Sequence, residues 1–146
     1  MIGAIITKKK VRSAFTNLQR RDLPAFLANV AEDSTFVVPG NISVSGTIKG
    51  KKKIEEWWGK FMEQFPKANF VLKNVFVQNI FAFSGTNVAA AEWDLALTNR
   101  EGKDFQEHGV TVINIKKGKI VLVSVYKLDT DIMRGAWGED NLPSKK

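Results

Sequence analysis

Two side chains suited to acid–base chemistry share one predicted face of the most strongly patterned part of the chain, residues 87–129. These are the carboxylate Glu107 and the chain's single tyrosine, Tyr126, with Trp93 between them. Burial on an apolar face favours the neutral carboxylic acid, which suits a general acid or base. A buried tyrosine hydroxyl suits a hydrogen bond to a ligand. A purely structural interpretation stays open for each residue. Glu107 would lie near a strand end, where its carboxylate reaches solvent or an N–H group. Tyr126 would be a core residue whose hydroxyl is hydrogen-bonded within the protein.

A second pair, Asp94 and His108, is predicted on the opposite face of the same strands. A carboxylate facing an imidazole forms an oriented acid–base couple, because it selects the tautomer and the orientation of the ring. The alternative is a pair at the surface or in an interface. The sequence therefore offers two candidate sites, one on each side of a sheet.

The segments that position these groups have the pattern of a β-meander. Three apolar-rich runs, 88–97, 105–115 and 120–128, are separated by the turn sequences at 100–103 and 116–119. A two-residue loop at Lys117-Gly118 fixes the register of the second hairpin. The predicted partners are Lys116 with Lys119, Ile113 with Leu122, Thr111 with Ser124, Gly109 with Tyr126, Leu97 with Phe105, Trp93 with Gly109, and Asp94 with His108.

This register divides the meander into two faces, although one β-bulge would move part of a strand to the other face. The face predicted to lie under helices holds Ala91, Trp93, Leu95, Leu97, Phe105, Glu107, Thr111, Ile113, Ile120, Leu122, Ser124, Tyr126 and Leu128. The other has a valine centre and a polar border: Ala90, Glu92, Asp94, Gln106, His108, Val110, Val112, Asn114, Val121, Val123, Val125 and Lys127.

The remaining elements are predicted from periodicity and from turn residues. Helices are expected over 8–20, over a short segment opened by Asp22 as N-cap with Pro24 in its first turn, and over 51–65. Strands are expected over 34–38 and 70–83, and 42–48 is a weak strand or loop. The chain past Asp129 shows no regular pattern. We expect one domain spanning 1–146, with a folded core over about 5–138 and a flexible C-terminal tail.

Composition excludes several classes of site. The 146 residues contain no cysteine and one histidine, so thiol chemistry and an ordinary zinc site are not expected, and no cofactor is implied. The net charge of +7 favours anionic partners, but the lysine clusters at 8–10, 51–53 and 116–119 lack interleaved aromatics, and nucleic acid is not the expected partner. No stretch has the length of a membrane span, so we expect a cytoplasmic protein without a membrane partner.

The order of elements resembles the nuclear transport factor 2-like superfamily, the SnoaL-like and ketosteroid isomerase-like cone. The motifs that carry the resemblance are Phe15-x-x-Leu18 with Arg21-Asp22-Leu23 and Phe26, Glu32-Asp33-Ser34-Thr35, Pro39-Gly40, Gly50-x-x-x-Ile54, Ala91-Glu92-Trp93, and Gly118-Lys119-Ile120 leading to Tyr126 and Asp129. The resemblance implies an α+β fold in which a curved, mostly antiparallel sheet wraps around N-terminal helices and encloses an apolar pocket. Its members have many chemistries.

The catalytic residues of two activities known in this superfamily are absent or incomplete in this sequence. Aligned on the ketosteroid isomerase pattern, the tyrosine falls on Ala14, the base on Val38 and the second acid at or near Thr111, so none of the three groups is present. The limonene epoxide hydrolase pattern has an Arg-x-Asp and a further Asp. Asp94 matches one acid, no arginine stands beside it, and Tyr126 replaces the other.

We therefore expect a small, largely apolar ligand, and two functions stay open. One is a cofactor-independent isomerase, cyclase or hydrolase, and the other is a non-catalytic ligand-binding or dimeric scaffold protein. The expected catalytic residues are Glu107 and Tyr126, or else Asp94 and His108. The expected pocket residues are Phe15, Trp57, Trp58, Phe61, Trp93, Thr111 and Ser124, with a gap for the ligand opposite Gly109. A homodimer is expected through the valine face, Val110, Val112, Val123 and Val125.

Overall fold

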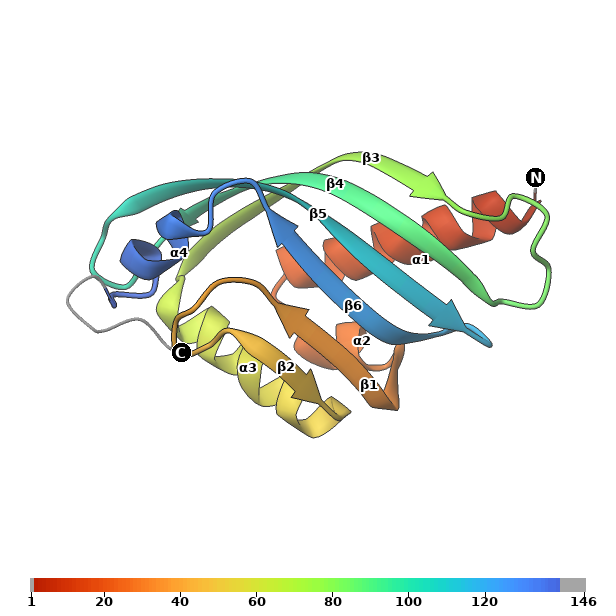
Figure 1. Cartoon of the computed structure of the whole chain (residues 1–146), viewed down its shortest axis with the longest axis horizontal. Helices are drawn as coiled ribbons and strands as arrows, with labels where there is room; N and C mark the ends of the chain where they lie inside the picture. The colour runs from red at the N-terminus through yellow and green to blue at the C-terminus, as the bar shows by residue number, and fades with distance from the viewer. Residues whose placement is uncertain (1, 140–146) are drawn as a thin grey trace.

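The computed structural model describes residues 2–139 and has the predicted α+β architecture. A six-stranded sheet has the order β2-β1-β6-β5-β4-β3, antiparallel throughout except where β1 runs parallel to β6 (Figure 1). In chain order the elements are α1 (Ile2–Gln19), α2 (Leu23–Leu27), β1 (Val30–Val38), β2 (Gly46–Lys49), α3 (Lys51–Gln64), β3 (Lys67–Val77), β4 (Asn87–Thr98), β5 (Asp104–Lys116), β6 (Lys119–Lys127) and α4 (Asp131–Ala136).

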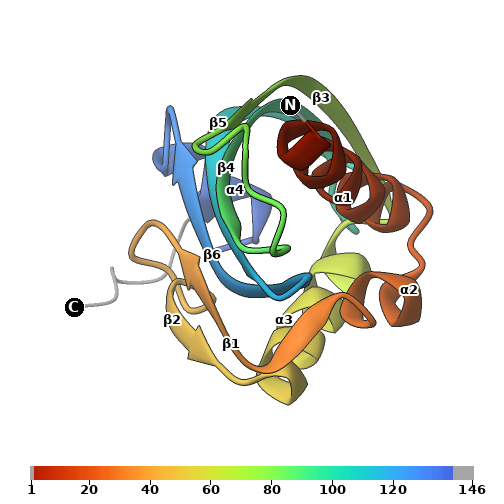
Figure 2. The same ribbon diagram turned by 90° about the vertical axis from the view of Figure 1, so that its right-hand side faces the viewer.

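The sheet curls around α1, while α2 and α3 close the side next to β1 (Figure 2). In α1 the buried positions Thr7, Val11, Ala14 and Leu18 recur at helical spacing, which gives the helix one face to pack on the sheet. In α3 the buried positions Ile54, Trp58 and Phe61 do the same. The sheet and these helices therefore enclose one apolar core.

Helix α1 begins at Ile2 rather than at Lys8, because Gly3 and Thr7 extend its buried stripe by two turns. A Cβ on Gly3 would lie 2.1 Å from the carbonyl oxygen of Ala82, so only glycine lets the helix approach this backbone. The second helix follows its signals: the Asp22 side chain accepts a hydrogen bond from the Ala25 N–H, with Pro24 in the first turn.

Several other boundaries differ from the sequence prediction. Strand β1 begins at Val30, and β3 ends at Val77 instead of continuing to Phe83. Residues 78–86 form a loop, which the Asn87 side chain holds by accepting from the Asn79 N–H and donating to the Asn79 carbonyl. Past Asp129 the chain forms helix α4. The predicted flexible tail falls mostly on residues 140–146, outside the described residues.

The first hairpin of the meander has the predicted register, and the second does not. Leu97 pairs with Phe105, Trp93 with Gly109 and Asp94 with His108. Lys116 also pairs with Lys119 as predicted, but the register shifts between Asn114 and Ile115 and leaves an extra residue on β6. Beyond this bulge the partners are Asn114 with Leu122, Ile113 with Val123, Thr111 with Val125, Val110 with Tyr126 and Gly109 with Lys127.

The bulge reverses the direction of every side chain on the rest of β6, because successive residues of a strand point to opposite faces. Val123, Val125 and Lys127 turn to the concave side, and Leu122, Ser124 and Tyr126 turn to the convex side. The predicted faces are wrong for this segment. The predicted valine patch is divided too, since only Val110 and Val112 of its four members stay on the convex face.

Candidate functional site

An enclosed apolar cavity lies between the concave face of the sheet and the helices. Its volume is ≈ 100 Å³. Aromatic rings from six elements form much of the wall, and aliphatic side chains form most of the rest. The lining residues are Ala14, Phe15, Leu18, Phe26, Val30, Ser34, Phe36, Ile54, Trp58, Phe61, Phe70, Trp93, Leu95, Thr111, Ile113, Ile120, Val123, Val125 and Lys127. The chemistry of the site depends on the three polar members of this set.

Ser34 on β1 is completely buried, and its Oγ has no hydrogen-bond partner among the described residues. Thr111 on β5 accepts a hydrogen bond of 2.8 Å from Trp93 Nε1. Because Thr111 is the acceptor there, its own hydroxyl proton remains available to a ligand. Two hydroxyl groups therefore lie on the wall of an otherwise apolar cavity, a common arrangement for fixing the orientation of a small ligand.

Lys127, at the end of β6, brings a positive charge to the same wall. Its Nζ lies 2.5 Å from Oε2 of Glu107, whose side chain is 1% exposed, while the lysine side chain is 12% exposed. Neither carboxylate oxygen accepts a hydrogen bond of regular geometry from the described residues. A buried carboxylate held by one lysine is incompletely satisfied, and such pairs are retained at a cost in stability.

The predicted gap opposite Gly109 is filled by the Trp93 ring itself. A Cβ on Gly109 would lie 2.7 Å from a carbon of that ring and 2.3 Å from the carbonyl oxygen of Tyr126. The glycine is therefore required for the indole to lie flat against the neighbouring strand. The space for a ligand lies deeper, between the sheet and the helices.

The predicted catalytic pair does not come together. Glu107 is buried on the concave side as expected, but Tyr126 is 61% exposed on the convex side. Five of the predicted pocket residues line the cavity, and two do not. Trp57 donates from Nε1 to the Val44 carbonyl in a separate surface hollow, and Ser124 points to the convex face with its partner Val112.

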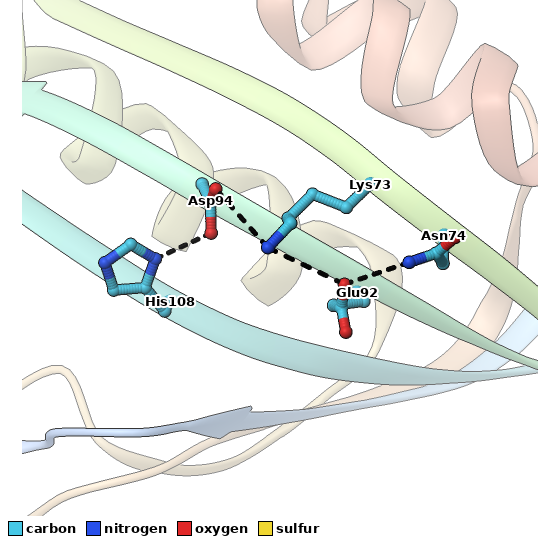
Figure 3. Close-up of polar contacts among 5 residues, drawn as sticks. All are labelled: Lys73, Asn74, Glu92, Asp94 and His108. Carbon is cyan, nitrogen blue, oxygen red and sulfur yellow. Dashed lines mark hydrogen bonds and ion pairs between the residues drawn. The ribbon is translucent and has the colours of Figure 1, made fainter.

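The alternative pair lies together on the convex face. Nδ1 of His108 is 2.6 Å from Oδ1 of Asp94, and Lys73 lies 3.9 Å from the other oxygen of that carboxylate (Figure 3). Lys73 also approaches Glu92, which accepts a hydrogen bond from Asn74. The hydrogen bond from His108 is the largest of the effects that lower the pKa of Asp94, and Lys73 adds to it. The cluster is solvated and borders a shallow surface hollow with Tyr126.

Ser34 and Lys127 line the site although no sequence pattern predicts either of them there. Lys127 was assigned to the convex face because no signal marked the bulge at Val121, where a run of β-branched residues fits either face equally well. Ser34 was noted only within a motif. Within residues 2–139, no group of three His, Asp or Glu side chains is placed to hold a metal ion, and no helix combines the length and apolar character needed to cross a membrane.

The curled sheet with helices in its concavity defines the class of nuclear transport factor 2-like α+β cones. The sequence matches the SnoaL-like domain family over residues 11–123, and the chain belongs to that family. No protein of curated function matches it significantly.

Solved structures of similar fold are distant in sequence. One is a Bacillus subtilis protein to which an isomerase function has been attributed, with 19% identity, a TM-score of 0.80, and coverage of 98% of this chain and 100% of the other. An NTF2-like protein of unknown function from Burkholderia pseudomallei has 19% identity and a TM-score of 0.78, covering 90% and 96%. TerC, co-crystallised with polyporic acid, has 15% identity and a TM-score of 0.74, covering 91% and 98%. At these identities the likeness establishes the fold alone.

Proposed function

We propose that this protein binds a small, largely apolar molecule in its interior cavity, with the polar end of the ligand held by Ser34, Thr111 and Lys127. The observation that carries the proposal is the Ser34 hydroxyl, which is fully buried on an apolar wall and has no hydrogen-bond partner within residues 2–139. Leaving such a group unsatisfied costs about 1–3 kcal/mol, which a ligand with a matching donor or acceptor would recover.

The size of the cavity limits the ligand. A cavity of about 150 Å³ lined by apolar side chains holds a benzene molecule. The volume of ≈ 100 Å³ here is smaller, and it fits a short branched chain carrying one polar group. That TerC was co-crystallised with polyporic acid supports the idea that a cone of this kind receives an organic molecule.

Glu107 and Lys127 favour a catalytic form of the proposal, a cofactor-independent isomerase, cyclase or hydrolase. The carboxylate would accept or donate a proton, and the ammonium would stabilise negative charge that develops on the ligand. The incompletely hydrogen-bonded carboxylate supports this form, because a purely structural ion pair would be expected to have its remaining lone pairs satisfied. The second candidate, a non-catalytic binder, needs only Ser34, Thr111 and the apolar wall.

The test compares two buried serines during a thermal-shift screen of small aromatic and branched aliphatic alcohols and ketones. Ser45 is also buried, but its Oγ donates to the Pro39 carbonyl and accepts from the Ile42 N–H. Ser34→Ala should leave the free protein as stable as the wild type or more so, and weaken ligand binding about tenfold. Ser45→Ala should lose about 1–2 kcal/mol of stability and leave ligand affinity unchanged.

A cavity-filling substitution tests the location. Ala14→Met should place its side chain in the cavity and abolish binding, whereas Thr16→Met on the exposed side of α1 should not. A ligand that binds the Ala14→Met protein with wild-type affinity would remove the cavity from consideration.

We also propose a homodimer through the convex face, which keeps Val110 and Val112 of the predicted valine patch and adds side chains from β3 and β6. Val71, Phe76, Val110 and Tyr126 are exposed there, and Val112 lies between them in the sheet. Several large apolar side chains on one sheet face favour pairing with a second copy. A monomer in light scattering at micromolar concentration would refute this assembly.

A further inference from the structure

One end of the molecule exposes six large apolar side chains that belong neither to the cavity nor to the convex face. They come from the first turns of α1 and from the loop 78–86, and their exposed fractions run from 43% to 70%. We call this surface the apolar end, and its members are Ile2, Ile5, Ile6, Ile80, Phe81 and Phe83. Exposed apolar residues gathered in this number are unusual on a soluble surface and mark an interaction site.

The apolar end is held together by specific contacts. The backbone of Gly3 packs directly on that of Ala82, and the Asn87 side chain donates to Thr7 Oγ1. The β5–β6 turn joins the same end, since the Gly118 N–H donates to the Gly85 carbonyl (Figure 1). Three chain segments therefore present one surface with a defined shape.

Lysines lie in the segments that build the apolar end, and acidic residues are absent from these segments. Lys8, Lys9 and Lys10 follow the isoleucines on α1, and Lys116, Lys117 and Lys119 lie at the β5–β6 turn. Segments 2–21, 64–91 and 108–128 contain no aspartate or glutamate. The local charge is therefore strongly positive.

We propose that the apolar end docks this protein on the surface of an anionic lipid membrane. The isoleucine and phenylalanine side chains would enter the boundary between headgroups and acyl chains, and the lysines would lie against lipid phosphates. This departs from the expectation of no membrane partner, which considered only segments long enough to span. Association with a surface needs no span.

Charge distinguishes this occupant from the alternatives. A second copy of the chain would bring its own six lysines against the first six, which repel each other. A nucleic acid would satisfy the lysines, but the isoleucines would gain nothing from a phosphate backbone. An anionic bilayer satisfies both kinds of side chain at once.

The experiment is co-sedimentation of the full chain with vesicles of phosphatidylcholine, with and without phosphatidylserine. We expect binding that requires phosphatidylserine and weakens in high salt. Phe81→Ser with Phe83→Ser should reduce the partition coefficient at least tenfold, and Lys9→Glu with Lys116→Glu should do the same. Lys52→Glu with Lys53→Glu, an equal charge change on the exposed start of α3, is the control and should change it less than threefold.

Insertion is measured directly with Phe83→Trp. The emission of this variant, corrected for the four native tryptophans, should shift to shorter wavelength on phosphatidylserine vesicles and be quenched by brominated acyl chains. Three results would overturn the proposal. They are an unshifted emission, equal losses from both charge reversals, or an oligomer in vesicle-free solution that dissociates when Phe81 and Phe83 become serine. Tighter binding to a single-stranded oligonucleotide than to the vesicles would likewise reject the lipid surface.

Discussion

On the concave side of the sheet, Glu107 and Lys127 form an ion pair that water hardly reaches. On the convex side, Asp94 and His108 form a hydrogen-bonded pair that is accessible to solvent. Glu107 and His108 are consecutive residues of β5, so the alternation of a strand separates them by the thickness of the sheet. The inner carboxylate has lost its hydration and has gained one lysine. The outer carboxylate has kept water and has gained a histidine and Lys73.

This difference shows that one sheet can build two unlike acid–base couples, and that the inner couple contributes a side chain, Lys127, to the wall of the interior cavity. If one charge of the inner couple is removed, the charge of the other residue remains buried and unpaired in a medium of low dielectric constant. A charge removed from the outer couple leaves a group that water solvates. The predictions below start with the inner couple and end with the outer face.

The largest expected effect is that of Lys127→Met. The substitution keeps most of the side-chain volume and leaves the Glu107 carboxylate buried without a cation, which should cost about 3–5 kcal/mol of unfolding free energy. Urea denaturation measures it. The double variant Lys127→Met with Glu107→Gln should recover much of the loss, because no unpaired charge remains. If Lys127→Met alone is as stable as the wild type, Lys127 does not compensate the charge of Glu107.

Val123→Lys is expected to cost about 2–3 kcal/mol, since it places an ammonium group on the apolar cavity wall. Val112→Lys, on the convex face of β5, should leave the monomer as stable as before and weaken the proposed dimer. Urea denaturation measures the stability of each variant, and light scattering measures whether it forms the dimer. If Val123→Lys leaves the monomer as stable as Val112→Lys does, the bulge in β6 is not present.

Glu107→Gln preserves shape and removes the titrating group. We expect a loss of about 1–3 kcal/mol in stability, since Lys127 keeps partial access to water. Ligand binding should persist, and any proton-transfer turnover should vanish. Turnover that survives in this variant would leave the protein as a binder or move the chemistry elsewhere.

The outer couple should respond mainly in its titration. His108→Ala removes the hydrogen bond that is the main cause of the lowered pKa of Asp94, so that pKa should rise toward its ordinary value of 3.8. NMR titration of the carboxyl carbon measures it. Because the folded pKa lies below the unfolded one, the couple stabilises the fold above that ordinary value and loses this contribution as pH falls through the folded pKa.

Tyr126→Phe should have the smallest effect. The hydroxyl lies in solvent on the convex face, so ligand affinity and monomer stability should stay at their wild-type values in calorimetric titration and urea denaturation. A loss of affinity of tenfold or more would mean that Tyr126 faces the pocket. The strand β6 would then have the register that a two-residue turn without a bulge predicts.

Most of the architecture follows from local patterns in the sequence. The periodicity of Ile54, Trp58 and Phe61 predicts α3, and Asp22 with Pro24 predicts the start of α2, because both are signals contained within a few residues. The turn at Lys117-Gly118 correctly pairs Lys116 with Lys119. The α+β cone itself was implied by the resemblance of this order of elements to the nuclear transport factor 2-like superfamily, and the structure confirms it.

The site was only half predictable, because it depends on one extra residue in β6. A bulge leaves no mark in a run such as Ile120-Val121-Leu122-Val123, where every residue suits either face. Glu107 was placed correctly since the first hairpin has no irregularity. Lys127 and Tyr126 lie on the faces opposite to those predicted. Ser34 gains its significance from having no hydrogen-bond partner within residues 2–139, and no sequence pattern indicates this.

The central claim is that the concave cavity, and not the convex cluster, receives the ligand. The most direct measurement is a crystal structure of the protein with the tightest ligand from the thermal-shift screen. The account predicts density between α1, α3 and the sheet, with a polar atom of the ligand within hydrogen-bond distance of Ser34 Oγ or Lys127 Nζ. Ligand density beside Asp94 and His108, with the cavity empty, would contradict it.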